Sequence, residues 1–188
     1  MVTRESNTHI QAMDSVIAFD PGGTTGVAGI RQGKVVLSVA VSYDELLNQL
    51  SSSNKSSKEY ADAVEYASFP IMVVEDFRLY PWKAKSMGFD RLPAVRVIGA
   101  LELFARANGQ RFVLQPAEKA KRFFPDEALA LLGWTEWLTN VHKRDAGRHA
   151  AYYLWRLQTY RETPETKRAA FFGAESVYYE RVDPCTGQ

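Results

Sequence analysis

Residues 16–30 read VIAFDPGGTTGVAGI, and this stretch decides the fold. An apolar run leads into Asp20, a turn of Pro, Gly and Thr follows, and a second apolar run begins at about Gly26. Short apolar runs bounded by Gly and Pro are typical of buried strands. The stretch therefore predicts two strands joined by a turn, with an acid at the end of the first strand.

The position of Asp20 points to a site. A carboxylate at the end of a buried strand is costly unless backbone N–H groups, a basic partner or a metal ion compensates it. The alternative is that Asp20 only initiates the turn, as Asp before Pro-Gly often does. We favour a site, because acids later in the chain can join Asp20.

The composition indicates one soluble globular domain. The chain has 188 residues, of which 46% are hydrophobic and 24% charged. Its single cysteine, Cys185, cannot form a disulfide within the chain, which fits a reducing compartment. The sequence contains no apolar run of membrane-spanning length and no signal-peptide pattern. We therefore expect a cytoplasmic protein without a membrane partner.

Charge is unevenly distributed along the chain. Residues 76–122 hold 10 basic and 4 acidic residues, whereas residues 1–75 hold 5 basic and 9 acidic ones. Local basic density favours contact with phosphate groups, whatever the total charge. The middle of the chain is therefore a candidate nucleic-acid interface, although a solvated face balanced by its neighbours is the alternative.

The hydrophobic pattern predicts an α/β fold with a mixed sheet, in which an antiparallel three-strand meander is flanked by helices. We expect a flexible leader at 1–13, one domain at 14–162, and a tail at 163–188 that packs on or extends the domain. Strands are predicted at 15–19, 26–31, 34–41, 70–75 and 111–115, and helices at 44–50, 60–66, 92–107, 117–124, 126–132 and 141–158.

Three acids lie on three of these elements. Asp20 and Glu75 end apolar strands, and Asp145 lies on the last helix. Neighbouring carboxylates repel one another and raise each other's pKa values unless a cation joins them. Mg²⁺ prefers oxygen ligands, and two such ions stabilise the attacking and leaving oxygens in phosphodiester cleavage. The acids beside the basic segment therefore indicate a metal-dependent nuclease.

Two histidines share a helix face with Asp145. His142 precedes Asp145 by three residues, and His149 follows it by four. His142 is predicted to be a fourth metal ligand or a proton-transfer group. His149 is placed at a polar position of the helix, from which it would orient Asp145; a purely structural role is the alternative for either histidine.

The chain resembles the RuvC-type Holliday junction resolvases of the RNase H-like superfamily, in the form carried by bacteriophages. The resemblance covers about residues 15–158 and rests on IAFDPG at 17–22, TGV at 25–27, VVE at 73–75 and HKRDA at 142–146. It implies an RNase H-like mixed sheet, two Mg²⁺ ions for which Mn²⁺ substitutes, a homodimer, and hydrolysis of branched DNA in the cytoplasm of the bacterial host.

Residue by residue, the resemblance assigns Asp20, Glu75 and Asp145 to the metal-binding acids, and His142 to a position where the family has another Asp or a His. The turn after Asp20 is about one residue shorter than in cellular resolvases. The helix also departs from the usual pattern after Asp145, with Gly147, Arg148 and His149.

Basic residues interleaved with aromatic ones follow Glu75. Aromatic rings can stack on unpaired bases while cations hold phosphates. A second basic cluster lies near residue 120. The predicted nucleic-acid contacts are Arg78, Tyr80, Trp82, Lys83, Lys85, Arg91, Lys119 and Lys121.

Two other functions are consistent with parts of this pattern. The turn at 20–25 resembles the phosphate loop of sugar kinases and actin-like ATPases, but those proteins are about twice as long and carry a second loop. A non-catalytic relative that binds branched DNA is the other alternative. An acidic cluster facing phosphates argues against a pure binder.

Overall fold

The computed structural model describes residues 15–77 and 92–162, with side chains described as far as Tyr160. The predicted leader and tail lie outside the described residues. So does the segment 78–91, and with it six of the predicted nucleic-acid contacts: Arg78, Tyr80, Trp82, Lys83, Lys85 and Arg91.

Five strands form one mixed sheet in the order β3-β2-β1-β4-β5. β1 pairs antiparallel with β2, and β2 pairs antiparallel with β3. On its other side β1 pairs parallel with β4, and β4 pairs parallel with β5. The strands are β1 (Ser15–Asp20), β2 (Thr24–Arg31), β3 (Lys34–Ser42), β4 (Ile71–Asp76) and β5 (Arg111–Pro116).

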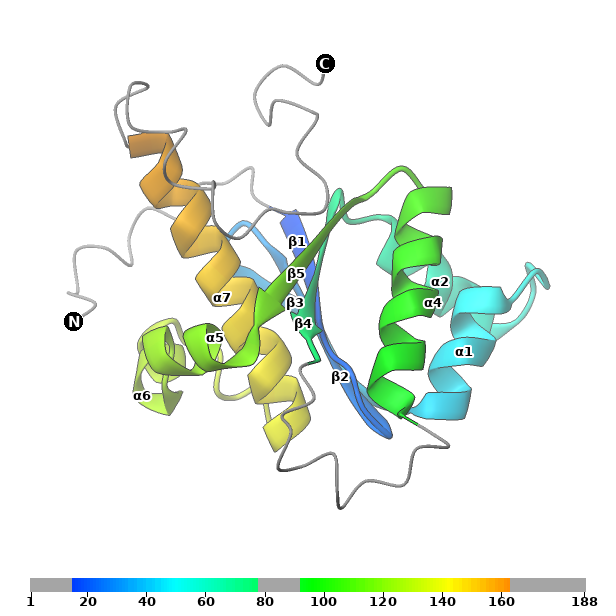
Figure 1. The fold of residues 1–188 in the computed structure, drawn as a ribbon, viewed down its shortest axis with the longest axis horizontal. Coiled ribbons are helices and arrows are strands. Elements are labelled where there is room, and N and C mark those ends of the chain that lie inside the picture. The colour runs from blue at the N-terminus through cyan, green and yellow to red at the C-terminus, as the bar shows by residue number, and fades with distance from the viewer. Residues whose placement is uncertain (1–14, 78–91, 163–188) are drawn as a thin grey trace.

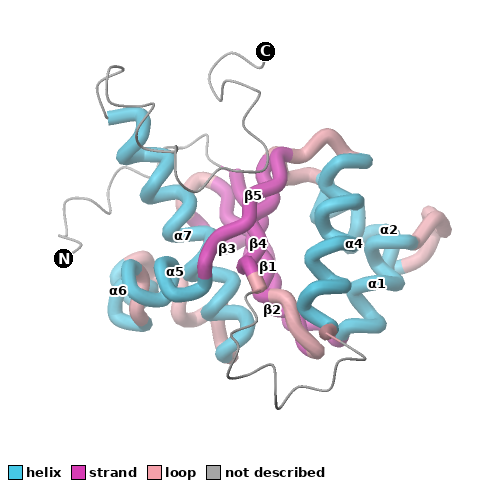
Figure 2. The backbone as a smooth tube through the Cα atoms, in the orientation of Figure 1, coloured by secondary structure: helices cyan, strands magenta, loops and turns pink. Residues whose placement is uncertain are grey.

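Helices cover both faces of this sheet (Figures 1 and 2). One layer holds α1 (Tyr43–Ser51), α2 (Lys58–Ala67) and α4 (Pro93–Ala107). The other holds α5 (Ala117–Phe123), α6 (Asp126–Leu131) and α7 (Val141–Glu162). The prediction of an α/β mixed sheet flanked by helices is confirmed.

The two faces follow from alternation along the strands, since successive side chains point to opposite sides of a sheet. In β1, Val16 and Ala18 belong to a core shared with α5, α6 and α7. Ile17 and Phe19 belong to the core under α1, α2 and α4. The central strand is thus buried on both sides, which explains why its sequence is a continuous apolar run.

Local signals account for several element ends. Ser42 and Ser57 accept hydrogen bonds from backbone N–H groups in the first turns of α1 and α2. Gly109 adopts a positive φ just after α4. Helices commonly end with a residue in this left-handed conformation, which glycine adopts without steric cost. β2 begins two residues earlier than predicted because Thr24 already pairs with Ser42 on β3.

Within 15–77 and 92–162, none of the helices combines the length and the apolar character needed to span a membrane.

Candidate functional site

Polar side chains end three adjacent parallel strands on one face of the sheet. Phe19 pairs with Val74, so Asp20 and Glu75 are the next residues along their strands. Glu75 in turn pairs with Gln115 at the end of β5. By strand alternation, Asp20, Glu75 and Gln115 share the face that carries α7. The carboxyl ends of parallel strands are a common place for sites in open α/β sheets.

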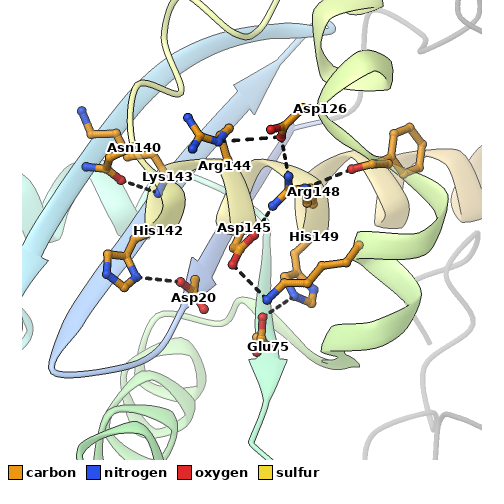
Figure 3. Close-up of polar contacts among 12 residues, drawn as sticks. Asp20, Glu75, Asp126, Asn140, His142, Lys143, Arg144, Asp145, Arg148 and His149 are labelled. Carbon is orange, nitrogen blue, oxygen red and sulfur yellow. Dashed lines mark hydrogen bonds and ion pairs between the residues drawn. The ribbon is translucent and has the colours of Figure 1, made fainter.

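Helix α7 adds its own polar side chains to this edge. His142, Asp145 and His149 lie three and four residues apart, which places them on one stripe of the helix. Figure 3 shows the stripe facing Asp20 and Glu75. The prediction that strand-end and helix residues converge is therefore supported by the arrangement of the elements.

Gly26 allows α7 to approach the sheet this closely. A Cβ atom on Gly26 would lie 2.0 Å from the backbone oxygen of His142. No side chain fits at that distance, so the first turn of α7 rests directly on the backbone of β2. This contact fixes how far His142 and Asp145 reach over the sheet.

Asp20 lies against His142. The Nδ1 atom of His142 is 3.1 Å from Oδ2 of Asp20, whose side chain is largely buried, whereas the His142 ring is partly exposed. Burial, followed by repulsion from Glu75 and more weakly from Asp145, raises the pKa of Asp20 from 3.8 to about 6, against the lowering effect of His142. Asp20 therefore lies in an acidic cluster with Glu75 and Asp145.

Asp145 lies between two cations. Lys121 Nζ is 2.9 Å from Asp145 Oδ2, and Arg148 contacts Oδ1. Arg148 also contacts Asp126 and donates to the backbone oxygen of Phe124, which links α7 to the end of α5 and the start of α6 (Figure 3). Although burial opposes it, the hydrogen bond to Asp145 raises the pKa of Lys121.

Glu75 is held by His149. The Nε2 atom of His149 is 3.0 Å from Glu75 Oε2, and its Nδ1 atom is 3.0 Å from Gln115 Oε1. The predicted contact of His149 with Asp145 is wrong, and so is its placement at a polar position. His149 is fully buried because the helix packs flat on the sheet, which turns this residue toward the ends of β4 and β5.

The types of donor atom at this edge suit a hard divalent cation. Three carboxylates and an imidazole supply oxygen and nitrogen ligands, and the burial and neighbouring acids that raise the pKa of Asp20 disfavour a carboxylate charge that a cation would stabilise. Among the described residues, however, no three Asp, Glu, His or Cys side chains stand in a ready metal-binding arrangement. Lys121 and Arg148 engage both carboxylate oxygens of Asp145, so a cation that binds Asp145 must displace one of these contacts, whereas the contacts of Asp20 and Glu75 each engage one oxygen.

Of the predicted nucleic-acid contacts, only Lys119 and Lys121 lie among the described residues. Both are on α5, and Lys121 contacts Asp145 directly. Lys121 therefore borders the acids.

The sequence interpretation missed Gln115. The signal that identified Asp20 and Glu75, a polar residue at the end of an apolar strand, also marks Gln115 at the end of β5. The bridging role of Arg148 carries no such signal, because it depends on how α6 and α7 pack.

Comparisons with known proteins agree with this fold. Neither a scan against protein-family models nor a search of curated proteins finds a match. Among solved structures, RuvC of Thermus thermophilus in complex with a Holliday junction substrate matches with a TM-score of 0.56 at 16% identity, over 78% of this chain and 96% of that one. A second structure of Thermus thermophilus RuvC matches with the same TM-score and identity, over 77% and 96%. The chain has the fold of RuvC.

Proposed function

We propose that this protein is a divalent-metal-dependent endonuclease that hydrolyses phosphodiester bonds in branched DNA, such as Holliday junctions and related intermediates. The observation that carries the proposal is the convergence of Asp20, Glu75 and Asp145 at one edge of the sheet, where burial, with added repulsion from the other two acids, raises the pKa of Asp20. The RuvC-like fold supports the same function. The assignment to the phage type rests only on the sequence motifs.

Asp20, Glu75, Asp145 and His142 are the residues that would hold the metal. Two Mg²⁺ ions, or Mn²⁺ in their place, would activate water and stabilise the leaving oxygen when bound. The chain itself supplies the negative charge and its rigid placement on β1, β4 and α7. His142 would either orient Asp20 through its contact with Oδ2, or break that contact and bind the cation itself.

Lys121 and Lys119 would receive the DNA. Lys121 is partly exposed beside Asp145, so its ammonium group can hold a phosphate next to the acids. The basic and aromatic residues predicted as contacts within 78–91 stay part of this proposal. A homodimer would present two such sites to the two sides of a junction.

A second candidate is a non-catalytic protein that binds branched DNA. The observation in its favour is that Lys121 and Arg148 already neutralise Asp145. A permanent ion pair there would leave the acids without a metal. An ATPase of the actin or sugar-kinase type is less consistent with the fold, since the described residues form one sheet rather than two related domains.

One assay separates these functions. The protein is incubated with labelled four-way junction, fork, flap and linear duplex in Mg²⁺ and in Mn²⁺, and the cuts are mapped. The proposal predicts metal-dependent cuts at branch points and little cutting of linear duplex. Tight junction binding without cuts in either metal would support the binder, and ATP hydrolysis without DNA would support the ATPase.

A further inference from the structure

We propose that His149 is a positioning residue that fixes the orientation of the Glu75 carboxylate, and that Gln115 in turn fixes His149. This inference rests on the proposed function, because it concerns how one of the candidate metal-binding acids is held. It names a chain of three side chains from β4, α7 and β5 that lies behind the site.

The first step is burial. The His149 side chain has no exposure, and Gln115 is 2% exposed, whereas Glu75 is 19% exposed at the surface of the site. A fully buried polar ring needs partners for its nitrogens, since a buried unpaired polar group costs free energy. His149 has one partner for each nitrogen, Glu75 and Gln115.

The second step is the direction of the hydrogen bonds. An ionised carboxylate only accepts hydrogen bonds, so Nε2 of His149 must donate to Glu75. The Gln115 amide nitrogen has no partner in the orientation shown, and exchanging its oxygen and nitrogen lets the amide donate to Nδ1 instead. In both orientations of the amide, Nε2 carries the hydrogen that faces Glu75.

The third step is the consequence for Glu75. His149 engages Oε2 from the buried side, so Oε1 remains to face the site. A long acidic side chain at a strand end would otherwise sample several rotamers, at an entropic cost to any ligand that requires one of them. Carboxylates that bind metals are commonly hydrogen-bonded by a second layer of residues, which orients them. His149 and Gln115 would be that layer here.

A matched pair of variants tests the inference. In His149→Gln, the side-chain amide nitrogen can take the position of the imidazole Nε2, so the contact with Glu75 is retained. In His149→Asn, the shorter side chain reaches only the position of the imidazole Nδ1. The contact with Gln115 is retained and the contact with Glu75 is lost. The readout is calorimetric binding of Mn²⁺ without DNA, together with thermal unfolding of each variant.

We expect His149→Asn to weaken Mn²⁺ binding by about 10–100-fold, and His149→Gln to weaken it by less than about tenfold. Gln115→Met, which removes the partner of Nδ1, should fall between the two. A merely structural role for His149 predicts that Mn²⁺ affinity follows thermal stability in all three variants. That result, or equal affinities for the Asn and Gln variants, would overturn the proposal.

Nuclear magnetic resonance of the unsubstituted protein covers the case in which the variants fail to fold. With ¹⁵N-labelled histidine, Nε2 of His149 should appear protonated, and its resonance should shift when Mg²⁺ is added. An unprotonated Nε2 or an unmoved resonance would contradict the assignment.

The inference and the proposed function can fail separately. If the protein cuts junctions and His149→Asn binds Mn²⁺ as the parent does, the positioning role is wrong and the nuclease stands. If Mn²⁺ binding follows the expected order but no DNA substrate is cut, the positioning role stands and the nuclease is wrong. If Mn²⁺ does not bind to the unsubstituted protein, both are wrong.

Discussion

At the scale of single residues, Asp20 is a carboxyl group whose charged form the fold disfavours. Its pKa rises from 3.8 to about 6, so the folded protein binds this proton more tightly than the unfolded chain does. Below about pH 4 both states are protonated and the group has no effect. As the pH rises from about 4 to about 6, the folded state loses up to about 3 kcal/mol of stability at this site.

Removing this charge should therefore stabilise the metal-free protein. We expect Asp20→Asn to raise the free energy of unfolding by about 1–3 kcal/mol near neutral pH, in the presence of a chelator, and by almost nothing near pH 4. Denaturant unfolding at the two pH values measures the difference. Asp44→Asn, an exposed position on α1, is the control and should show no such pH dependence. A gain of equal size at both pH values would contradict the electrostatic cause.

Some residues of the site were predictable from the sequence, and others were not. Asp20 and Glu75 were predictable because each ends an apolar strand, and the strand order confirms that they are neighbours. The partner of His149 was not predictable from helical spacing. Spacing says which residues share a stripe, whereas the packing of α7 decides which strand end each one meets.

At the scale of elements, the approach of α7 to β2 controls the geometry of the site. Gly26 has no space for a Cβ atom beside His142, so a side chain there must push the start of the helix away. We expect Gly26→Ala to lower stability by about 1–3 kcal/mol and to reduce cleavage sharply, because His142 and Asp145 would both shift.

Gly99→Ala is the matched control for this substitution. A Cβ atom at Gly99 meets nothing within 4 Å, and the residue lies inside α4 on the other layer. Alanine there should stabilise the helix by up to about 1 kcal/mol and leave cleavage unchanged. Thermal unfolding and cleavage assays of both variants check the prediction. Normal cleavage by Gly26→Ala would show that the helix start does not set the site.

The elements themselves followed closely from the sequence. Strand and helix positions agree with the apolar pattern because both faces of the sheet are covered, which keeps the strands continuously apolar. The lengths of β2 and α7 were underestimated. Pairing of Thr24 with Ser42 extends β2, and such tertiary contacts leave little trace in a single sequence.

At the scale of the whole molecule, Lys121 of α5 borders the acidic site, so the proposed DNA binding should depend on salt through the basic residues of α5. Replacing Lys119 and Lys121 by Gln should weaken junction binding, and each lost phosphate contact should lower the slope of log affinity against log salt by about 0.7–0.9. Lys55→Gln, in the loop between α1 and α2 on the other layer, should leave the slope unchanged. A slope unaffected by loss of Lys119 and Lys121 would remove α5 from the DNA interface.

Cleavage of one labelled four-way junction tests the central claim most directly. The parent protein, Asp20→Asn, Glu75→Gln and Asp145→Asn are compared in Mg²⁺, with a chelator and a linear duplex of the same sequence as controls. We predict paired cuts near the branch point by the parent protein in Mg²⁺ only, and loss of cleavage by about 100-fold or more in each variant with folding and junction binding retained. Normal cleavage by any of the three variants would remove that residue from the site, and absence of cleavage by the parent protein would contradict the nuclease altogether.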